Sequence, residues 1–206
     1  MCKDRKAAAD LSLDREITRR GFFDLAFRIG ATGAMATTVL GALPSPALAD
    51  PTQNQWRYCN KCHVLFFDGY ANKGRCPAGG GHHAQGYDFI LTHDVRETAK
   101  RQGAWRYCAK CHAMYFDGYP QKGVCPAGGG HAAAGYVFVL SHDVAADPLH
   151  QGAWRYCNKC HAMFYDGYAN KGRCPAGGGH VAQGYNFVLR LMGNLENDNV
   201  GVPVQE

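Results

Sequence analysis

The chain has 206 residues, of which 46% are hydrophobic and 19% charged, and it contains 26 glycines and ten cysteines. Residues 50–206 hold 15 Lys and Arg against 12 Asp and Glu. This small, interspersed surplus of positive charge argues against binding to nucleic acid or to an anionic membrane surface. Ser141 is the one serine in this part of the chain, so nucleophiles for hydrolytic chemistry are scarce.

Residues 1–49 resemble a bacterial twin-arginine export signal. Residues 18–23 read TRRGFF, a Gly- and Ala-rich stretch runs on to Leu43, and residues 47–49 offer a small-x-small cleavage site. Asp24 and Arg28 interrupt the apolar stretch, and the remainder is shorter than the ~20 residues of a spanning helix. We therefore expect a periplasmic or extracellular protein without a membrane anchor.

From residue 50 onwards the chain consists of three copies of one unit. The sequence WRYC begins at positions 56, 105 and 154, so the period is 49 residues. Self-similarity at a fixed period indicates one supersecondary unit used three times. The predicted organisation is repeat 1 at 50–100, repeat 2 at 101–149, repeat 3 at 150–192 and a flexible tail at 193–206.

Within a unit the local signals are those of short strands and turns. In the first copy, residues 56–58 and 64–67 are β-type runs on either side of a C-x-x-C pair. Asp68-Gly69 is a turn dipeptide, residues 77–81 (PAGGG) form a tight loop, and residues 87–91 alternate as a half-buried strand does. The predicted class is small, all-β and built of zinc-ribbon-like units. These units stand as beads on a string or close around a pseudo-threefold axis in a trefoil-like way.

Three cysteines and one histidine recur in every unit with the spacing C-x2-C-x13-C-x5-H. Three cysteines per unit, and nine in residues 50–206, cannot all pair as disulfides. Three thiolates and an imidazole instead make a tetrahedral zinc site. Bound zinc is worth ~10–16 kcal/mol in comparable peptides, which would stabilise a unit too small to fold unaided. The predicted ligands of three structural Zn²⁺ ions are Cys59, Cys62, Cys76 and His82; Cys108, Cys111, Cys125 and His131; and Cys157, Cys160, Cys174 and His180.

The same residues offer a second interpretation, because Cys59, Cys62 and His63 spell C-x-x-C-H, the attachment motif of c-type haem. Haem would leave Cys76 unused and would not explain the sequence CPAGGGH that follows it. Export in a folded state also favours zinc. A periplasmic three-haem electron carrier is kept as the alternative.

The remaining histidines fall into two groups. His63, His112 and His161 recur, and we expect them to be surface histidines hydrogen-bonded to nearby backbone. His93 and His142 align with Leu191 of the third copy, so a site that all three units share does not require them.

The units resemble tandem repeats of secreted bacterial proteins, on the motifs W-R-x-C-x-K-C, an aromatic pair, C-P-A-G-G-G-H and G-x-x-F-x-L-x-H-D. The resemblance covers residues 53–191, and residues 190–192 of the third copy depart from the final H-D step. It implies zinc-ribbon-type beads, sometimes appended to extracellular hydrolases, and it implies no particular activity.

We expect a non-catalytic module that binds glycan or cell-envelope polymer, since weak repeated sites gain ~10²–10⁴-fold from avidity. An enzyme is not expected, because Asp68, Asp117 and Asp166 each precede a glycine as turn residues do. The alternative for the tryptophans is that they form a miniature core. The candidate binding residues are Trp56, Trp105, Trp154, Tyr70, Tyr119 and Tyr168.

Overall fold

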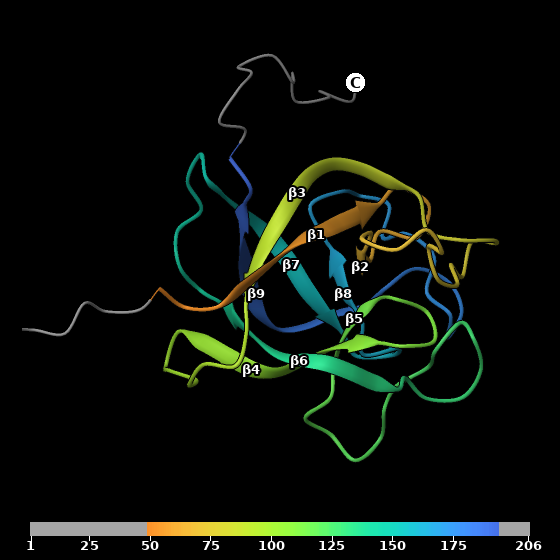
Figure 1. Cartoon of the computed structure of the whole chain (residues 1–206). Helices are drawn as coiled ribbons and strands as arrows, with labels where there is room; N and C mark the ends of the chain where they lie inside the picture. The colour runs from red at the N-terminus through yellow and green to blue at the C-terminus, as the bar shows by residue number, and fades with distance from the viewer. Residues whose placement is uncertain (1–48, 194–206) are drawn as a thin grey trace, which may run out of the picture. The chain divides into compact units, whose positions relative to one another are not determined.

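The computed structural model describes residues 49–193, so most of the predicted export signal and of the C-terminal tail lies outside the described residues. Figure 1 shows strands and connecting loops throughout this part, and no helix in it could span a membrane. The strands are β1 (Thr52–Cys59), β2 (Leu65–Phe67), β3 (Ala84–Thr92), β4 (Arg101–Cys108), β5 (Met114–Phe116), β6 (Ala133–Ser141), β7 (His150–Cys157), β8 (Met163–Tyr165) and β9 (Ala182–Leu191).

Each repeat contributes three antiparallel strands with a long strand at their centre, and pairing of β3 with β9 joins repeats 1 and 3 into one six-stranded sheet. β1 pairs with β2 on one side and β3 on the other, β4 pairs with β5 and β6, and β7 pairs with β8 and β9. The aromatic pairs after each C-x-x-C form the short strands, as predicted. The observed long strands extend beyond the sequence-predicted runs.

The three repeats close on themselves. Phe66 of repeat 1 bridges to Ala113 of repeat 2, and the equivalent bridges Tyr115–Ala162 and Phe164–Val64 complete the circle. The three short strands all contact one another, and so do β3, β6 and β9. Of the two arrangements that the sequence leaves open, the structure therefore has the closed, trefoil-like one.

The buried side chains form two layers. One contains the nine cysteines together with Phe66, Tyr115 and Phe164, and the other contains the three tryptophans. The short strands lie between the layers, because successive side chains of a strand point to opposite faces. Accordingly Phe66 packs with the cysteines while its neighbour Leu65 packs with the tryptophans.

The tryptophans pack between repeats and are fully buried. Trp56 meets Phe138 of the next repeat edge-on, with ring centroids 5.0 Å apart, and equivalent pairs join Trp105 to Phe187 and Trp154 to Phe89. The interpretation of Trp56, Trp105 and Trp154 as ligand platforms is therefore wrong, because a side chain with no exposed surface cannot stack on a polymer. The core interpretation is confirmed.

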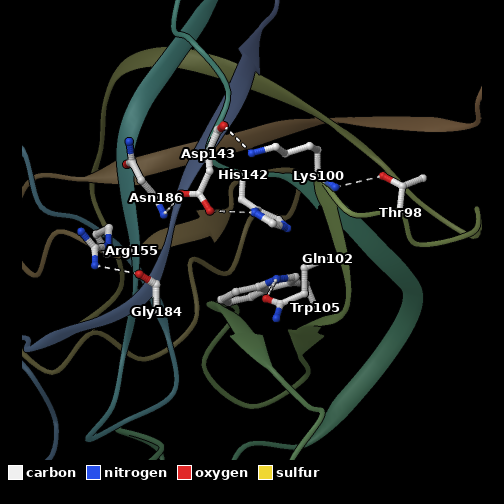
Figure 2. Close-up of polar contacts among 9 residues, drawn as sticks. All are labelled: Thr98, Lys100, Gln102, Trp105, His142, Asp143, Arg155, Gly184 and Asn186. Atoms are coloured by element: carbon white, nitrogen blue, oxygen red, sulfur yellow. Dashed lines mark hydrogen bonds and ion pairs between the residues drawn. The ribbon is translucent and has the colours of Figure 1, made fainter.

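Each buried indole N–H has a partner three residues earlier in the chain. The Trp105 Nε1–H donates to Gln102 Oε1 at 3.2 Å (Figure 2), and Trp56 and Trp154 do the same with Gln53 and Gln151. A buried N–H without such an acceptor would cost about 1–3 kcal/mol.

His142 and Asp143 tie repeat 2 to repeat 3 (Figure 2). One Asp143 carboxylate oxygen accepts a hydrogen bond from His142 Nδ1 at 3.1 Å, and the other accepts one from the Asn186 backbone N–H at 3.1 Å. His93 and Asp94 tie repeat 1 to repeat 2 in the same way. His93 and His142 are therefore contacts between repeats. Their equivalent in the third copy, Leu191, instead pairs within the sheet with Phe89 of repeat 1.

Candidate metal centres

The structure brings each predicted ligand quartet together. In every repeat the four donor atoms lie within 4.8 Å of one another, all four residues are buried, and the cysteines are free of disulfides. The cysteines and histidines named from their spacing are the residues that meet. Each group could hold one metal ion, which makes three per chain.

The donor distances fit a tetrahedral ion. Zinc with Zn–S bonds of about 2.3 Å and Zn–N bonds of about 2.0 Å places two sulfurs about 3.8 Å apart and sulfur and nitrogen about 3.5 Å apart. Cys108 Sγ and Cys125 Sγ are separated by 3.9 Å, and Cys111 Sγ and His131 Nδ1 by 3.4 Å. A disulfide would instead require about 2.05 Å between sulfurs.

Two local turns position the ligands. In the first repeat β1 ends at Cys59, whose N–H donates to Val64 O while the His63 N–H donates back to Cys59 O. This tight hairpin turns Cys62 towards Cys59. In the second turn the Cys76 N–H donates to Gly80 O at 2.8 Å, and this backbone curl requires a positive φ of 63° at Gly80, which glycine adopts without strain.

The histidine ligand belongs to one repeat but is oriented by the next. His82 Nε2 lies 3.0 Å from the carbonyl oxygen of Cys111, which can only accept a hydrogen bond, so Nε2 carries the proton and Nδ1 presents its lone pair to the metal. His131 contacts Cys160 O in the same way, and His180 contacts Cys62 O. Such outer contacts fix the ring and the tautomer of a metal-binding histidine.

A glycine permits this close approach of two repeats. Gly74 has φ +66°, and a Cβ at this position would collide with the backbone carbonyl of Cys111. Gly123 faces Cys160, and Gly172 faces Cys62, in the same relation. Each metal loop is thereby pressed onto the C-x-x-C hairpin of the following repeat.

The electrostatics of the quartet suit a cation. Hydrogen bonds from Cys62 and Cys76 lower the pKa of Cys59, whereas burial raises the pKa of Cys62. Burial alone would lower the pKa of His82, but hydrogen bonds to the Cys59 and Cys76 sulfurs outweigh it and raise the pKa to about 9. Without a metal the group must therefore retain protons, which a divalent ion displaces on binding.

The histidines that follow the C-x-x-C pairs differ from expectation. His63 and His112 are buried, His161 is half-buried, and all three have a left-handed backbone with φ between 66° and 69°. The expectation of a surface position is wrong, because the hairpin turns left-handed and directs each histidine carbonyl towards the neighbouring repeat. There the His112 carbonyl accepts a hydrogen bond from the Phe67 N–H at 3.0 Å. As expected, none of the three joins a ligand quartet.

The arrangement favours a metal ion over covalent haem. Cys59 and Cys62 have no exposed surface, and their sulfurs face Cys76 and His82, so the pair is not presented to a porphyrin. Comparison of the chain with models of protein families, with curated proteins and with solved structures gives no match. The geometry alone defines the class, which is a closed all-β protein of three tandem metal-binding repeats.

Two recurrent residues, one at the metal site and one beside the tryptophan layer, could not be recognised by the motifs used above. Lys61 in the first hairpin donates through Nζ to the Gly79 carbonyl at 2.6 Å and so joins the two ligand-bearing turns. The indole acceptor Gln53 also recurs with each tryptophan. Both repeat at the 49-residue period, and that recurrence is the signal that could have revealed them.

Proposed function

We propose that the protein is a non-catalytic, zinc-stabilised module that binds glycan or cell-envelope polymer at three equivalent surface sites. The observation that carries the proposal is a cluster of one exposed tyrosine, one half-buried tyrosine and one histidine that recurs at each boundary between repeats. Zinc is the proposed metal, since tetrahedral coordination by three thiolates and an imidazole is typical of structural zinc.

Each surface cluster combines one exposed tyrosine with two residues of the neighbouring repeat. The Tyr70 ring is 54% exposed and lies 6.2 Å from the Tyr107 ring and 5.8 Å from the His112 ring. Tyr119 stands in the same relation to Tyr156 and His161, and Tyr168 to Tyr58 and His63.

Such a cluster offers the chemistry that a sugar ring needs. Tyrosine presents a flat apolar face together with a polar hydroxyl group. Burial, and next the nearby Tyr70, raise the pKa of Tyr107 to about 12. Its hydroxyl is protonated at neutral pH, as that of an unperturbed tyrosine also is, and can donate to a ligand. Three such sites on one chain would bind a repeating polymer through avidity.

Catalysis is not part of the proposal. Four protein ligands leave no open coordination position for water. Asp68 forms an ion pair with Lys73 at 2.8 Å, and Asp117 and Asp166 pair with Lys122 and Lys171 in the same way. These carboxylates are engaged in holding the loop next to the metal site.

Retention of the zinc-loaded protein on immobilised polysaccharides and on peptidoglycan tests the proposal. We expect at least one of these polymers to retain the protein, and we expect the triple substitution Tyr70→Ala, Tyr119→Ala, Tyr168→Ala to abolish retention at unchanged metal content. The matched control removes three other exposed tyrosines, with Tyr87→Ala, Tyr136→Ala, Tyr185→Ala. Failure of every polymer, or equal loss in both triple variants, would refute the proposal.

Export by the twin-arginine route belongs to the same proposal, because the expected ligand lies outside the cytoplasm. Replacing Arg19 and Arg20 by lysine should retain the protein in the cytoplasm, as measured by fractionation and immunoblotting. Undiminished export of that variant would contradict the assignment.

A further inference from the structure

The three metal loops meet around a hollow on the pseudo-threefold axis. Pro77, Pro126 and Pro175 occupy equivalent positions in the three repeats, and all three line it. A second hollow of about 500 Å³ adjoins it between repeats 1 and 3. It shares Pro77 and Pro175 with the first and is lined by Arg173 and Gly177 among others. Proline has no backbone N–H, so the three proline rings add apolar surface to a wall that is otherwise of mixed polarity.

Each hollow is lined by one arginine, Arg75 in the first and Arg173 in the second. Arg75 and Arg173 each stand immediately before a ligand cysteine, and Val124 takes the equivalent place in repeat 2. Both arginines are exposed, and neither forms an ion pair within residues 49–193. The repeated fold does not require an arginine here, because the second repeat forms its loop with valine.

The positive charges of Arg75 and Arg173 are not required to neutralise the metal centres. A divalent ion with three thiolates and a neutral imidazole carries a net charge of about −1. Each repeat supplies one lysine whose ammonium group lies over its metal loop: Lys61 at Gly79 O, Lys110 at Gly128 O and Lys159 at Gly177 O. These three lysines balance three centres, so Arg75 and Arg173 remain as a surplus of two positive charges.

We propose that these two adjoining hollows bind phosphate or sulfate through Arg75 and Arg173. A guanidinium group can donate two parallel hydrogen bonds to a tetrahedral oxyanion. The site is separate from the tyrosine clusters, and it does not depend on the proposed binding of glycan.

NMR titration of the zinc-loaded, ¹⁵N-labelled protein with sodium phosphate and sodium sulfate, against chloride at equal ionic strength, tests the site. We expect saturable shifts of the amide signals of residues 75–80 and 172–178. The double variant Arg75→Ser, Arg173→Ser should weaken the apparent affinity about tenfold or more. Val124→Arg, which supplies the third arginine, should strengthen it.

The matched control removes two arginines from the joining segment and from the end of β9, with Arg96→Ser and Arg190→Ser. This variant has the same net charge as the test variant, and we expect it to keep the parental affinity. Shifts that do not saturate, or equal losses in both double variants, would show general charge screening and overturn the proposal. A second titration with polyphosphate identifies the source of the bound group. Tighter binding of polyphosphate than of inorganic phosphate indicates a group carried by a polymer, and equal binding indicates a free ion.

Discussion

At the residue scale, glycine has two different roles in each repeat. Gly123 and Gly135 share almost the same backbone, with φ of +63° and +66°. A Cβ on Gly123 would strike the Cys160 carbonyl, whereas a Cβ on Gly135 would have nothing within 4 Å. The first glycine is required by the contact between repeats, and the second by backbone conformation alone.

We predict that Gly123→Ala destabilises the protein more than Gly135→Ala. Both substitutions incur the left-handed strain of about 1–2 kcal/mol, and Gly123→Ala adds about 1–3 kcal/mol for the overpacked contact. Denaturant unfolding of the two metal-loaded variants measures the difference. Equal losses of stability would show that the contact between repeats does not restrict this position.

A second residue-scale prediction concerns the buried indole. Gln102→Ala leaves the Trp105 N–H without its acceptor, which should cost about 1–3 kcal/mol of unfolding free energy. Gln121→Ala, at an exposed position, is the control and should change stability by less than about 0.5 kcal/mol. Unfolding monitored by tryptophan fluorescence compares the two variants, and similar values would contradict this role of Gln102.

The ligands could be predicted from sequence because metal coordination imposes both residue type and spacing on a short segment. Cys59, Cys62, Cys76 and His82 lie within 24 residues of one another and needed no long-range information. The conformation of His63 could not be predicted in this way. Its left-handed backbone directs the His63 carbonyl oxygen to the Tyr165 N–H, from which it accepts a hydrogen bond. Tyr165 lies about a hundred residues away along the chain.

At the element scale, each metal centre consists of two turns from one repeat and is supported by a turn from the next. The chain of contacts is circular, because His82 reaches Cys111, His131 reaches Cys160 and His180 returns to Cys62. Each ring therefore bonds directly to the residue that supplies a ligand to the neighbouring centre.

We predict that the loss of one histidine weakens more than one centre. His131→Ala removes a ligand of the second centre and frees the Cys160 carbonyl beside the third, and loss of such a support typically costs 10–100-fold in metal affinity. Competition with a chromophoric chelator measures the ions that remain. His83→Ala, which alters an exposed histidine outside the quartets, is the control. Two remaining ions of parental affinity would show that the centres are independent.

At the scale of the whole described unit, the repeats share both layers of the core. Trp56 has its edge-on partner Phe138 in repeat 2, and Phe66 bridges to Ala113 in the same repeat. A single repeat therefore lacks neighbours for its largest buried side chain and for its short strand.

We predict that residues 50–100 alone stay unfolded even with excess zinc, whereas residues 50–193 fold. Trp56 and Phe66 of the first repeat both have partners in the second, and a unit of about 50 residues has little stability to lose. Circular dichroism and amide NMR dispersion of the two fragments provide the measurement. A folded single repeat would show that the units are self-sufficient beads.

The closure of the repeats could not be predicted from the sequence, and the reason is the repetition itself. Phe89, Phe138 and Phe187 are equivalent positions, so the pattern is the same whether Trp56 packs on its own repeat or on the next. The strands and turns were predictable because their signals are local. Which repeat packs against which is decided by side-chain packing between the repeats. A periodic sequence does not encode this choice in its local pattern.

The central claim is that three Cys3His centres hold this fold together, and metal content per folded chain tests it most directly. Inductively coupled plasma mass spectrometry of the purified, folded protein should give three zinc ions per chain. A folded protein with a metal content near zero would contradict the account.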